Sequence, residues 1–458
     1  MSALSEGKIA IVRTLVESAP DRVVGGLWQA LAETTDDSAL GGVKRLVEVE
    51  VSERNLRNTI LQPIAPMCIG AGDDPHRLTF PSWVLRMLWR GLCAVDHEEL
   101  IAKVRNAPAL DTPAHLVALA ADRLTALAAA SLRAREQADF RAVAQLCDEG
   151  RTGGADLLAA CLDIAPTVRR ATQKLPEWLA HSGGDTAAGA RLAYRDAVTA
   201  DEDAGARFFE MLSAQMAYPW MVLRVISAVM DKPTERYLAD SEMAGFGEGL
   251  LTDIDASLAQ ISGLDADAGP LAARSVAKLA ELVIQQIMEI ETSVDLQREH
   301  GWGQRVHKQR AGLASVVEGR LREAEKAAME ALPMQAARNP RIRRPAPRLD
   351  TPPDPRCVGR ARTLLSFSDE LRSTANYGGF SSARNKMVEK LSEYIDQYVH
   401  EVLDTIRAGE VEDIGIAAAY LEEAAALDEL IRGTKAGELV RRRAQAVLQS
   451  EPSRQHNG

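Results

Sequence analysis

Histidines and carboxylates are the side chains in this sequence that could do acid–base or metal chemistry. A carboxylate-bridged di-iron bundle requires Glu-x-x-His pairs, because residues three positions apart project from the same face of a helix. None of the eight histidines has a glutamate three positions before it. Asp73 precedes His76 by three positions and could seat a cation, but the surrounding glycines and proline favour a turn. We therefore predict no metal ligands.

Known phosphate-binding and nucleophilic motifs are also missing from the sequence. Gly433-Thr434-Lys435 lacks the earlier glycine and the preceding strand of a P-loop. Gly245-Phe246-Gly247-Glu248-Gly249 begins like a dinucleotide fingerprint, but its third glycine comes one residue too early. No Gly-x-Ser-x-Gly sequence marks a serine nucleophile. We predict no catalytic residues and no bound cofactor, with an enzyme of unrecognised site as an alternative.

Arginines gather in a proline-spaced segment, residues 333–356. Its seven prolines are Pro333, Pro340, Pro345, Pro347, Pro352, Pro353 and Pro355. Because proline removes a backbone donor and disfavours helix in the residue before it, no helix should cross this segment. Eight arginines and two aspartates give residues 333–362 a local charge of +6, against -11 for the chain. We predict an extended linker whose candidate contacts with an acidic partner are Arg341, Arg343, Arg344 and Arg348.

Two tryptophans, Trp83 and Trp89, lie in an apolar run that also carries two arginines one helical turn apart. This composition suits a core helix, and it also suits a short helix that grips a partner or lies at a membrane surface. The net negative charge of the chain disfavours contact with anionic lipid. We therefore keep Trp83 and Trp89 as candidate partner-binding residues.

A third tryptophan, Trp302, lies between two glycines, with Arg305 and Lys308 close by in the sequence. Such a tip could stack on a nucleic-acid base, receive an acidic peptide or plug the end of a helical hairpin. All three residues are therefore candidates for partner binding.

Apolar residues recur at helical spacing over most of the chain, which predicts long packed helices. The longest stripe comprises Ala272, Val276, Leu279, Val283, Ile287, Ile290 and Val294. Shorter stripes after the linker, ending near Gly409 and Gly433, predict a C-terminal bundle. The alternating segment 45–51 fits either a helix or an extended strand.

Composition agrees with an all-α fold, because 46% of residues are hydrophobic, 26% are charged and only 4% are aromatic. We predict an irregular helical array or bundle, open to stacking as solenoid-like hairpins, plus a small C-terminal helical bundle. The predicted segments are an N-terminal helical region (1–110, with a Pro/Gly loop at 62–81), a long-helix array (111–332), the linker (333–356) and the C-terminal bundle (357–458).

Cysteine usage and hydropathy bear on the compartment. Five scattered cysteines form no Cys-x-x-Cys pair, which is typical of a reducing compartment. No basic-then-apolar leader and no apolar run of about 18 residues is present, so we predict a cytoplasmic protein without a transmembrane segment. The leading functional hypothesis is a non-catalytic adaptor or scaffold with a protein partner. The alternative is a nucleic-acid-associated regulator that uses the basic linker.

Overall fold

A computed structural model describes residues 6–33, 40–69, 77–94, 97–180, 184–335 and 345–450. These residues form nineteen α-helices, two short 3-10 helices and four strands of two residues each. The prediction of an all-α protein is therefore confirmed. The alternating segment 45–51 lies inside helix α3.

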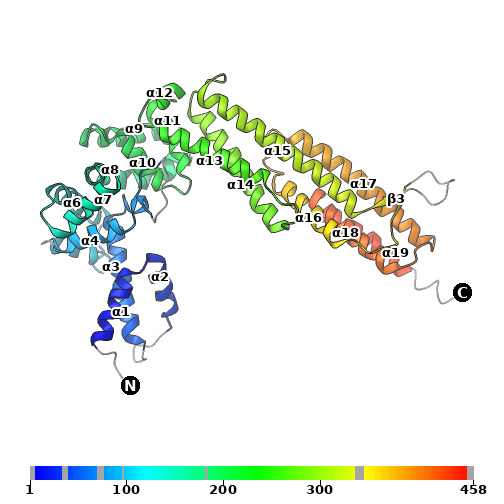
Figure 1. Cartoon of the computed structure of the whole chain (residues 1–458), viewed down its shortest axis with the longest axis horizontal. Coiled ribbons are helices and arrows are strands. Elements are labelled where there is room, and N and C mark those ends of the chain that lie inside the picture. The colour runs from blue at the N-terminus through cyan, green and yellow to red at the C-terminus, as the bar shows by residue number, and fades with distance from the viewer. Residues whose placement is uncertain are drawn as a thin grey trace. The chain divides into compact units, whose positions relative to one another are not determined.

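Contacts between residues divide the chain into two compact units. Unit 1 comprises Met1–Pro233 and Asp240–Phe246, and unit 2 comprises Thr234–Ala239 and Gly247–Gly458. In Figure 1 most of unit 1 is blue to green, and most of unit 2 is green to red. The predicted boundary at 333–356 differs from this division, which falls close to residue 240.

Within its described residues, unit 1 holds the first eleven helices. They are α1 (Glu6–Ser18), α2 (Asp21–Ala30), α3 (Gly41–Ile60), α4 (Trp83–Ala94), α5 (Glu98–Arg105), α6 (Ala114–Ala134), α7 (Ala138–Gly150), α8 (Gly154–Ala180), α9 (Gly184–Ala200), α10 (Ala204–Ala214) and α11 (Val222–Met230). The 3-10 helices are η1 (Ala65–Met67) and η2 (Pro219–Met221), and strands β1 (Cys68–Ile69) and β2 (Phe80–Pro81) pair in parallel.

Helix α8 is the central helix of unit 1. It packs against α6, α7, α9 and α10, and most of its residues are buried. Three aromatic rings in the same unit, Phe140, Phe208 and Phe209, are completely buried. Alanines on α6 and α8 allow these two long helices to approach closely, as the low aromatic content predicts.

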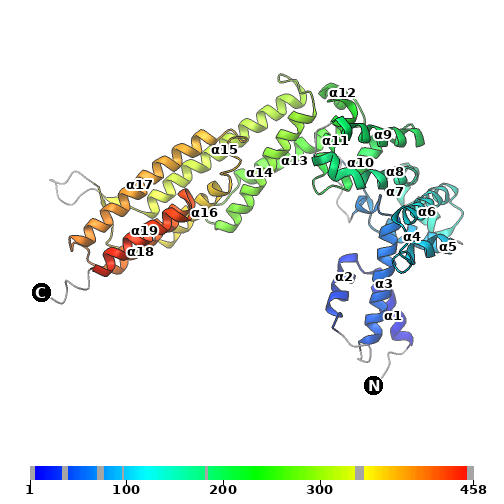
Figure 2. The ribbon, with the colours of Figure 1, turned by 180° about the vertical axis from the view of Figure 1, so that it is seen from behind.

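Unit 2 consists of one short helix, α12 (Glu235–Ala239), and a bundle of longer helices. The longer helices are most of α13 (Ala244–Ser262), α14 (Pro270–Ser293), α15 (Gly301–Ala331), α16 (Pro355–Glu370), α17 (Ser381–Arg407), α18 (Ile414–Arg432) and α19 (Thr434–Ser450). Figures 1 and 2 both show α15 and α17 side by side, and these helices are in contact.

The proline-rich segment begins and ends within unit 2. Helix α15 stops at Ala331 and α16 starts at Pro355, so the described residues contain no helix across the prolines. Between them, β3 (Met334–Gln335) and β4 (Ala346–Pro347) pair antiparallel, and the Arg348 N–H donates to the Pro333 carbonyl oxygen at 2.9 Å. Because α15 packs on both α16 and α17, the helices on either side of this segment belong to one unit.

Candidate functional site

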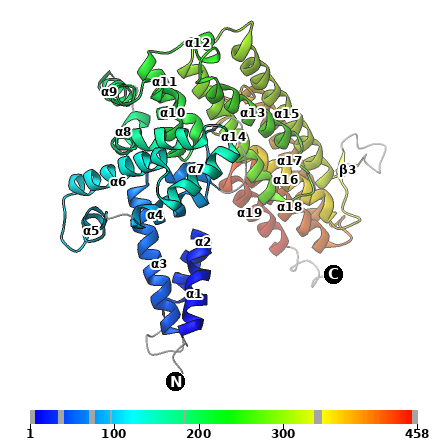
Figure 3. The ribbon, with the colours of Figure 1, turned by 60° about the vertical axis from the view of Figure 1, so that its left-hand side comes forward.

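Helices α1, α2 and α3 form a small subassembly with a minimal core. Helices α1 and α2 each pack on α3, where they bury Val16, Val24 and Val47. Val43 and Val51 lie one turn on either side of Val47 and pack against the same cluster. This spacing explains why the alternating segment folds as a helix. Figure 3 shows α1 and α2 alongside α3.

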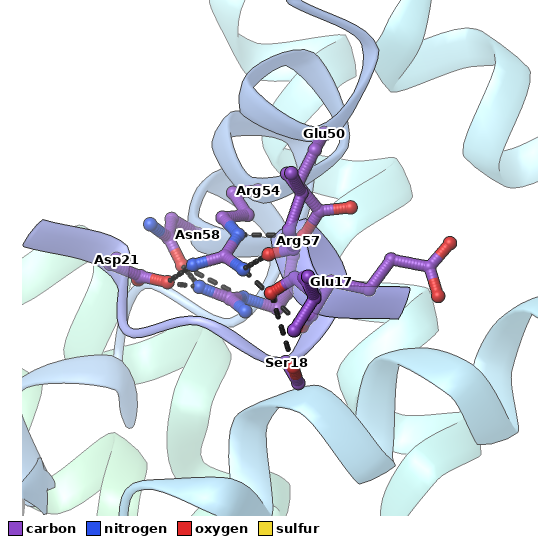
Figure 4. A network of polar contacts seen from close by, with 9 residues as sticks. Glu17, Ser18, Asp21, Glu50, Arg54, Arg57 and Asn58 are labelled. Atoms are coloured by element: carbon purple, nitrogen blue, oxygen red, sulfur yellow. Dashed lines mark hydrogen bonds and ion pairs between the residues drawn. The ribbon is translucent and has the colours of Figure 1, made fainter. Parts of the chain in front are cut away.

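A buried arginine on α3 joins the three helices (Figure 4). Arg54 donates from Nη1 to Asp21 Oδ1 and from Nε to Glu50 Oε1, each at 2.6 Å. Its Nη2 donates to the carbonyl oxygen of Val16 at 2.9 Å, near the C-terminal end of α1. Arg54 therefore links α3 to the end of α1 and to the first residue of α2.

A second arginine of α3 completes this network. Arg57 donates from Nη2 to Asp21 Oδ2 at 2.7 Å and from Nε to Asn58 Oδ1 at 3.0 Å. Both oxygens of Asp21 thus accept from guanidinium groups, and Asp21 also lies at the helix N-terminus that favours negative charge. Charged groups as well as apolar contacts therefore hold the turn between α1 and α2 on α3.

Replacing Arg54 with methionine is expected to loosen α1 and α2 while the rest of unit 1 stays folded. The change leaves Glu50 and the Val16 carbonyl without their donor, and we expect local opening to become easier by about 3 kcal/mol. Hydrogen exchange of the α1 and α2 amides measures this directly. Arg45→Met is the matched control, because Arg45 is exposed on the same helix. Equal exchange rates in the two variants would contradict the prediction.

Helices α1 and α2 also carry apolar side chains that no described residue covers. Ile11 and Leu15 of α1 are each 62% exposed, one turn apart, beside the inward-facing stripe of the same helix. Val23, Leu27 and Trp28 of α2 are likewise exposed, with Trp28 at 48%. We call these five residues the outer stripes. A helix that is apolar on two faces is ordinarily buried on both.

Exposed charges of both signs lie on α1, α2 and α3. Arg13, Arg22 and Arg45, one from each helix, are exposed and form no ion pair with a described residue. Asp21 and Glu50 bind arginines of α3, whereas Glu17, Glu33 and Glu48 are exposed carboxylates in or next to these helices. Sequence analysis missed the outer stripes, although the run Ile9–Val16 signals them by carrying apolar residues on adjacent faces of one helix.

Of the residues predicted to bind a partner, Trp83 and Trp89 lie on α4. Trp89 is 9% exposed and belongs to the core of unit 1, and Trp83 is partly buried. Helix α4 packs against α6 and α7. Trp89 is therefore a core side chain in this structure, whereas Trp83 stays partly exposed.

Trp302 is the second residue of α15 and is buried, with 4% of its surface exposed. Its ring lies over Gly247 of α13, where an added Cβ would come within 2.3 Å of the ring. The indole Nε1 donates to Glu248 Oε1 at 2.5 Å. Three roles were considered for this ring: stacking on a base, binding an acidic peptide and plugging the end of a helical hairpin. Its buried position fits the third.

The two basic residues after Trp302 are placed differently from each other. Arg305 is paired with Glu248 at 3.1 Å and with Asp255 at 2.6 Å, so its charge is balanced within unit 2. Lys308 is exposed on α15. Neither residue joins a wider basic surface with Trp302, because the indole faces inward.

Four linker arginines were predicted to contact a partner, and the structure describes one of them, Arg348. It is half-exposed and donates from Nε to Asp350 Oδ1 at 3.0 Å. The other three, Arg341, Arg343 and Arg344, lie outside the described residues, as do Asp73 and His76. The structure therefore does not gather the predicted residues into one site: Trp83 and Trp89 belong to unit 1, and Trp302, Arg305, Lys308 and Arg348 to unit 2.

All five cysteines carry free thiols. Burial raises the pKa of Cys161 to about 12 and the pKa of Cys93 and Cys147 to about 11. Burial also raises the pKa of Cys68. These four thiols are protonated at neutral pH, and the protonated form is a poor nucleophile.

Unit 1 has an open cleft of about 670 Å³ between α3, α6 and α8. Its lining is mainly uncharged: Asn55, Asn58, Thr59, Gln62, Ala114, Val117, Ala118, Ala121, Thr172 and Gln173. The guanidinium of Arg169 also reaches it, but this group donates to Asp122 Oδ1 at 2.9 Å and to the Thr59 and Ile60 carbonyls at 2.8 and 2.7 Å. The cleft therefore presents amides and hydroxyls, with its one cation already bound to protein.

Comparison of the chain with protein-family models, with curated proteins and with solved structures finds no match. Function must therefore be inferred from the geometry of the chain.

One helix of the described residues, α6, is long and apolar enough to cross a membrane by length and composition. Core helices have the same properties, and α6 buries Leu124, Ala128 and Leu132 within unit 1. Its contact with α8 accounts for part of its apolar character, while Leu116 and Leu119 stay exposed, and a membrane-spanning segment is not indicated.

Proposed function

We propose that this chain is a non-catalytic interaction protein, an adaptor or scaffold, that binds an amphipathic helix of a partner protein along the outer stripes. The observation that carries the proposal is the second apolar face of α1 and α2. Seven of the nineteen large apolar side chains that are exposed in the described residues fall between Ile11 and Val49. Single exposed apolar residues are ordinary, but such clustering in one short subassembly favours a binding surface.

The physical gain from covering the outer stripes is hydrophobic. Burial of apolar surface stabilises a complex by roughly 25 cal/mol per Å². Trp28 is the natural anchor, because large aromatic side chains at the centre of an interface supply a disproportionate share of the binding energy. Ile11 and Leu15, one turn apart, suit the ridges of a second helix.

Two exposed arginines, Arg13 and Arg22, favour a different protein over a second copy of this chain. A second copy that placed its own arginines against them would be disfavoured, because like charges repel. A partner helix with acidic residues beside its apolar stripe would complement these arginines. We also propose a cytoplasmic location, which the five free cysteines support.

The test uses the full chain, the double variant Leu15→Glu/Trp28→Ser and the control Leu439→Glu. Leu439 is 58% exposed on α19 and lies outside the outer stripes. Proteins retained from native cells are identified, and each candidate is then purified and titrated against all three chains. We expect one purified partner to bind the full chain and the control equally, and the double variant at least about thirtyfold more weakly.

Three results would overturn the proposal. They are the absence of any purified partner that binds, a partner that binds the double variant as well as the full chain, and self-association of the full chain that the double variant abolishes. Circular dichroism and thermal unfolding of all three chains show whether the substitutions preserve the fold. The exposure of both substituted positions predicts that they do.

A further inference from the structure

Unit 2 contains an arginine-lined cleft of about 580 Å³ between the N-terminal ends of α14 and α16. These two helices pack against one another and lie together in Figures 1 and 2. The cleft is lined by Asp267, Gly269, Pro270, Pro355, Arg356, Gly359, Arg360, Arg362 and Thr363. Three cations therefore face one carboxylate across a cleft of the size that small ligands occupy.

Arg356 and Arg360 are only loosely paired. Arg356 Nη2 lies 3.5 Å from Asp267 Oδ2, and Arg360 Nε lies 3.7 Å from Asp267 Oδ1. Charge-assisted hydrogen bonds between a guanidinium and an oxyanion are usually about 2.7 to 2.9 Å long. A single carboxylate, itself partly exposed, thus stands between two guanidinium groups without satisfying either of them.

Arg362 contributes a third positive group at the edge of the cleft. Its Nη2 donates to Glu423 Oε2 at 2.6 Å. Its Nε is buried and has no hydrogen-bond partner among the described residues. Buried donors are ordinarily satisfied, so an unpaired donor beside a cleft is consistent with a missing acceptor.

The N-terminus of α14 adds to the positive potential. Gly269 is its N-cap residue and supplies no side-chain acceptor for the free N–H groups of the first turn. Such a terminus attracts anions, because its free N–H groups and the helix dipole both favour negative charge. By contrast, Asp354 caps α16 and accepts from the Arg356 N–H at 3.0 Å.

We propose that this cleft binds the phosphate or pyrophosphate group of a small phosphorylated molecule. In the complex Arg356 and Arg360 donate to the phosphate oxygens, and the anion takes the place of Asp267 between them. Arginine suits this role, because its planar fork matches the oxygens of a phosphate group. The net charge of -11 repels long polyanions and leaves a compact anion as the better ligand for a local basic cleft.

Substitution of Gly359 by a residue with a side chain should block the cleft without disturbing the helix. Gly359 lies on α16 between the two loosely paired arginines, and an added Cβ would meet no atom within 4 Å. A side chain at this position therefore has room, and replacement of an interior helical glycine usually favours the helix. Gly319 on α15 has the same open surroundings but does not line the cleft, so it is the matched control.

The experiment titrates the full chain with inorganic phosphate and with pyrophosphate by calorimetry, at low and at physiological salt. We expect saturable binding at one site, weakened by added salt. Arg360→Gln should weaken it about tenfold, which corresponds to the loss of one charge-assisted hydrogen bond. Gly359→Glu should abolish binding, whereas Gly319→Glu and the exposed control Arg442→Gln should leave it unchanged.

Asp267→Asn should have the opposite effect on phosphate binding from Arg360→Gln. Removal of the competing carboxylate should tighten phosphate binding about fivefold, an effect that a damaged fold would not produce. Preference for pyrophosphate identifies a diphosphate group as the ligand, and equal affinity identifies a monophosphate. The proposal is overturned if neither anion binds saturably, if Gly359→Glu and Gly319→Glu behave alike, or if Asp267→Asn weakens binding.

Discussion

Replacing Arg432 with methionine is expected to destabilise the packing of α17 on α18 by about 4 kcal/mol. Arg432 is the last residue of α18 and donates from Nε and Nη2 to the two oxygens of Asp428, at 2.6 and 2.7 Å. It also donates from Nη1 and Nη2 to Asp396 of α17, at 2.9 and 2.7 Å. Asp428 is completely buried, so the variant leaves a buried carboxylate without its cation.

The hydrogen bonds from Arg432 to Asp396 and Asp428 hold the pKa of Arg432 above its usual range, so the guanidinium group stays protonated. Hydrogen exchange of α17 and α18 in the full chain measures the effect, since two units need not unfold together. Arg442→Met, which removes an exposed pair with Glu438 on α19, should change exchange little.

A double variant, Arg432→Met with Asp428→Leu, removes the ion pair without leaving a buried carboxylate unpaired. It therefore distinguishes the cost of losing the ion pair from the cost of an unpaired buried charge. Removal of both partners should recover most of the stability, because no charge is then left buried. If the amides of α17 and α18 exchange at similar rates in the single and the double variant, the unpaired charge of Asp428 is not what destabilises the single variant.

Replacing Glu235 with alanine is expected to destabilise the start of α15 by about 4 kcal/mol. The Glu235 carboxylate is buried and accepts from three backbone N–H groups: Trp302 at 2.9 Å, Gly303 at 3.0 Å and Gln297 at 3.1 Å. A carboxylate at a helix N-terminus also interacts favourably with the helix dipole. Without it, the buried N–H groups of Trp302 and Gly303 and the partly buried N–H of Gln297 lose their acceptor.

The measurement is the exchange of these three amides in the full chain, together with thermal unfolding. Glu235→Gln retains one acceptor oxygen and should have an intermediate effect. Glu248→Gln is the control, because Glu248 binds the indole of Trp302 and not the backbone of the turn. The prediction fails if the three amides exchange at the same rate in Glu235→Ala as in the unaltered chain.

The helix ends after the proline-rich segment were predictable because they depend on local conformation. Gly409 and Gly433 adopt φ values of +71° and +97°, which glycine tolerates better than other residues, and they follow the ends of α17 and α18. Likewise α15 ends at Ala331, two residues before Pro333, and α16 begins at Pro355. In each case the cause is the residue itself or its neighbour in the chain.

Which face of a helix is buried was predictable only in part. The predicted stripe of α14 matches the buried face from Val283 to Ile290. Earlier in the helix the buried residues are Ala273, Ala277 and Ala280, each one position after the predicted ones. Periodicity favours the larger side chains, whereas the buried face also depends on how α14 packs against its neighbours, of which α16 is one.

The sequence by itself determined that this chain is helical, because side-chain spacing, proline and glycine act within a few residues of one another. Only the tertiary structure decided which charged groups pair with one another and which aromatic side chains are buried. Trp302 becomes a buried plug because Gly247 leaves room for it, and Asp267 reaches Arg356 across 89 positions of sequence. Pairings at such separation depend on how helices pack, and no local pattern encodes them.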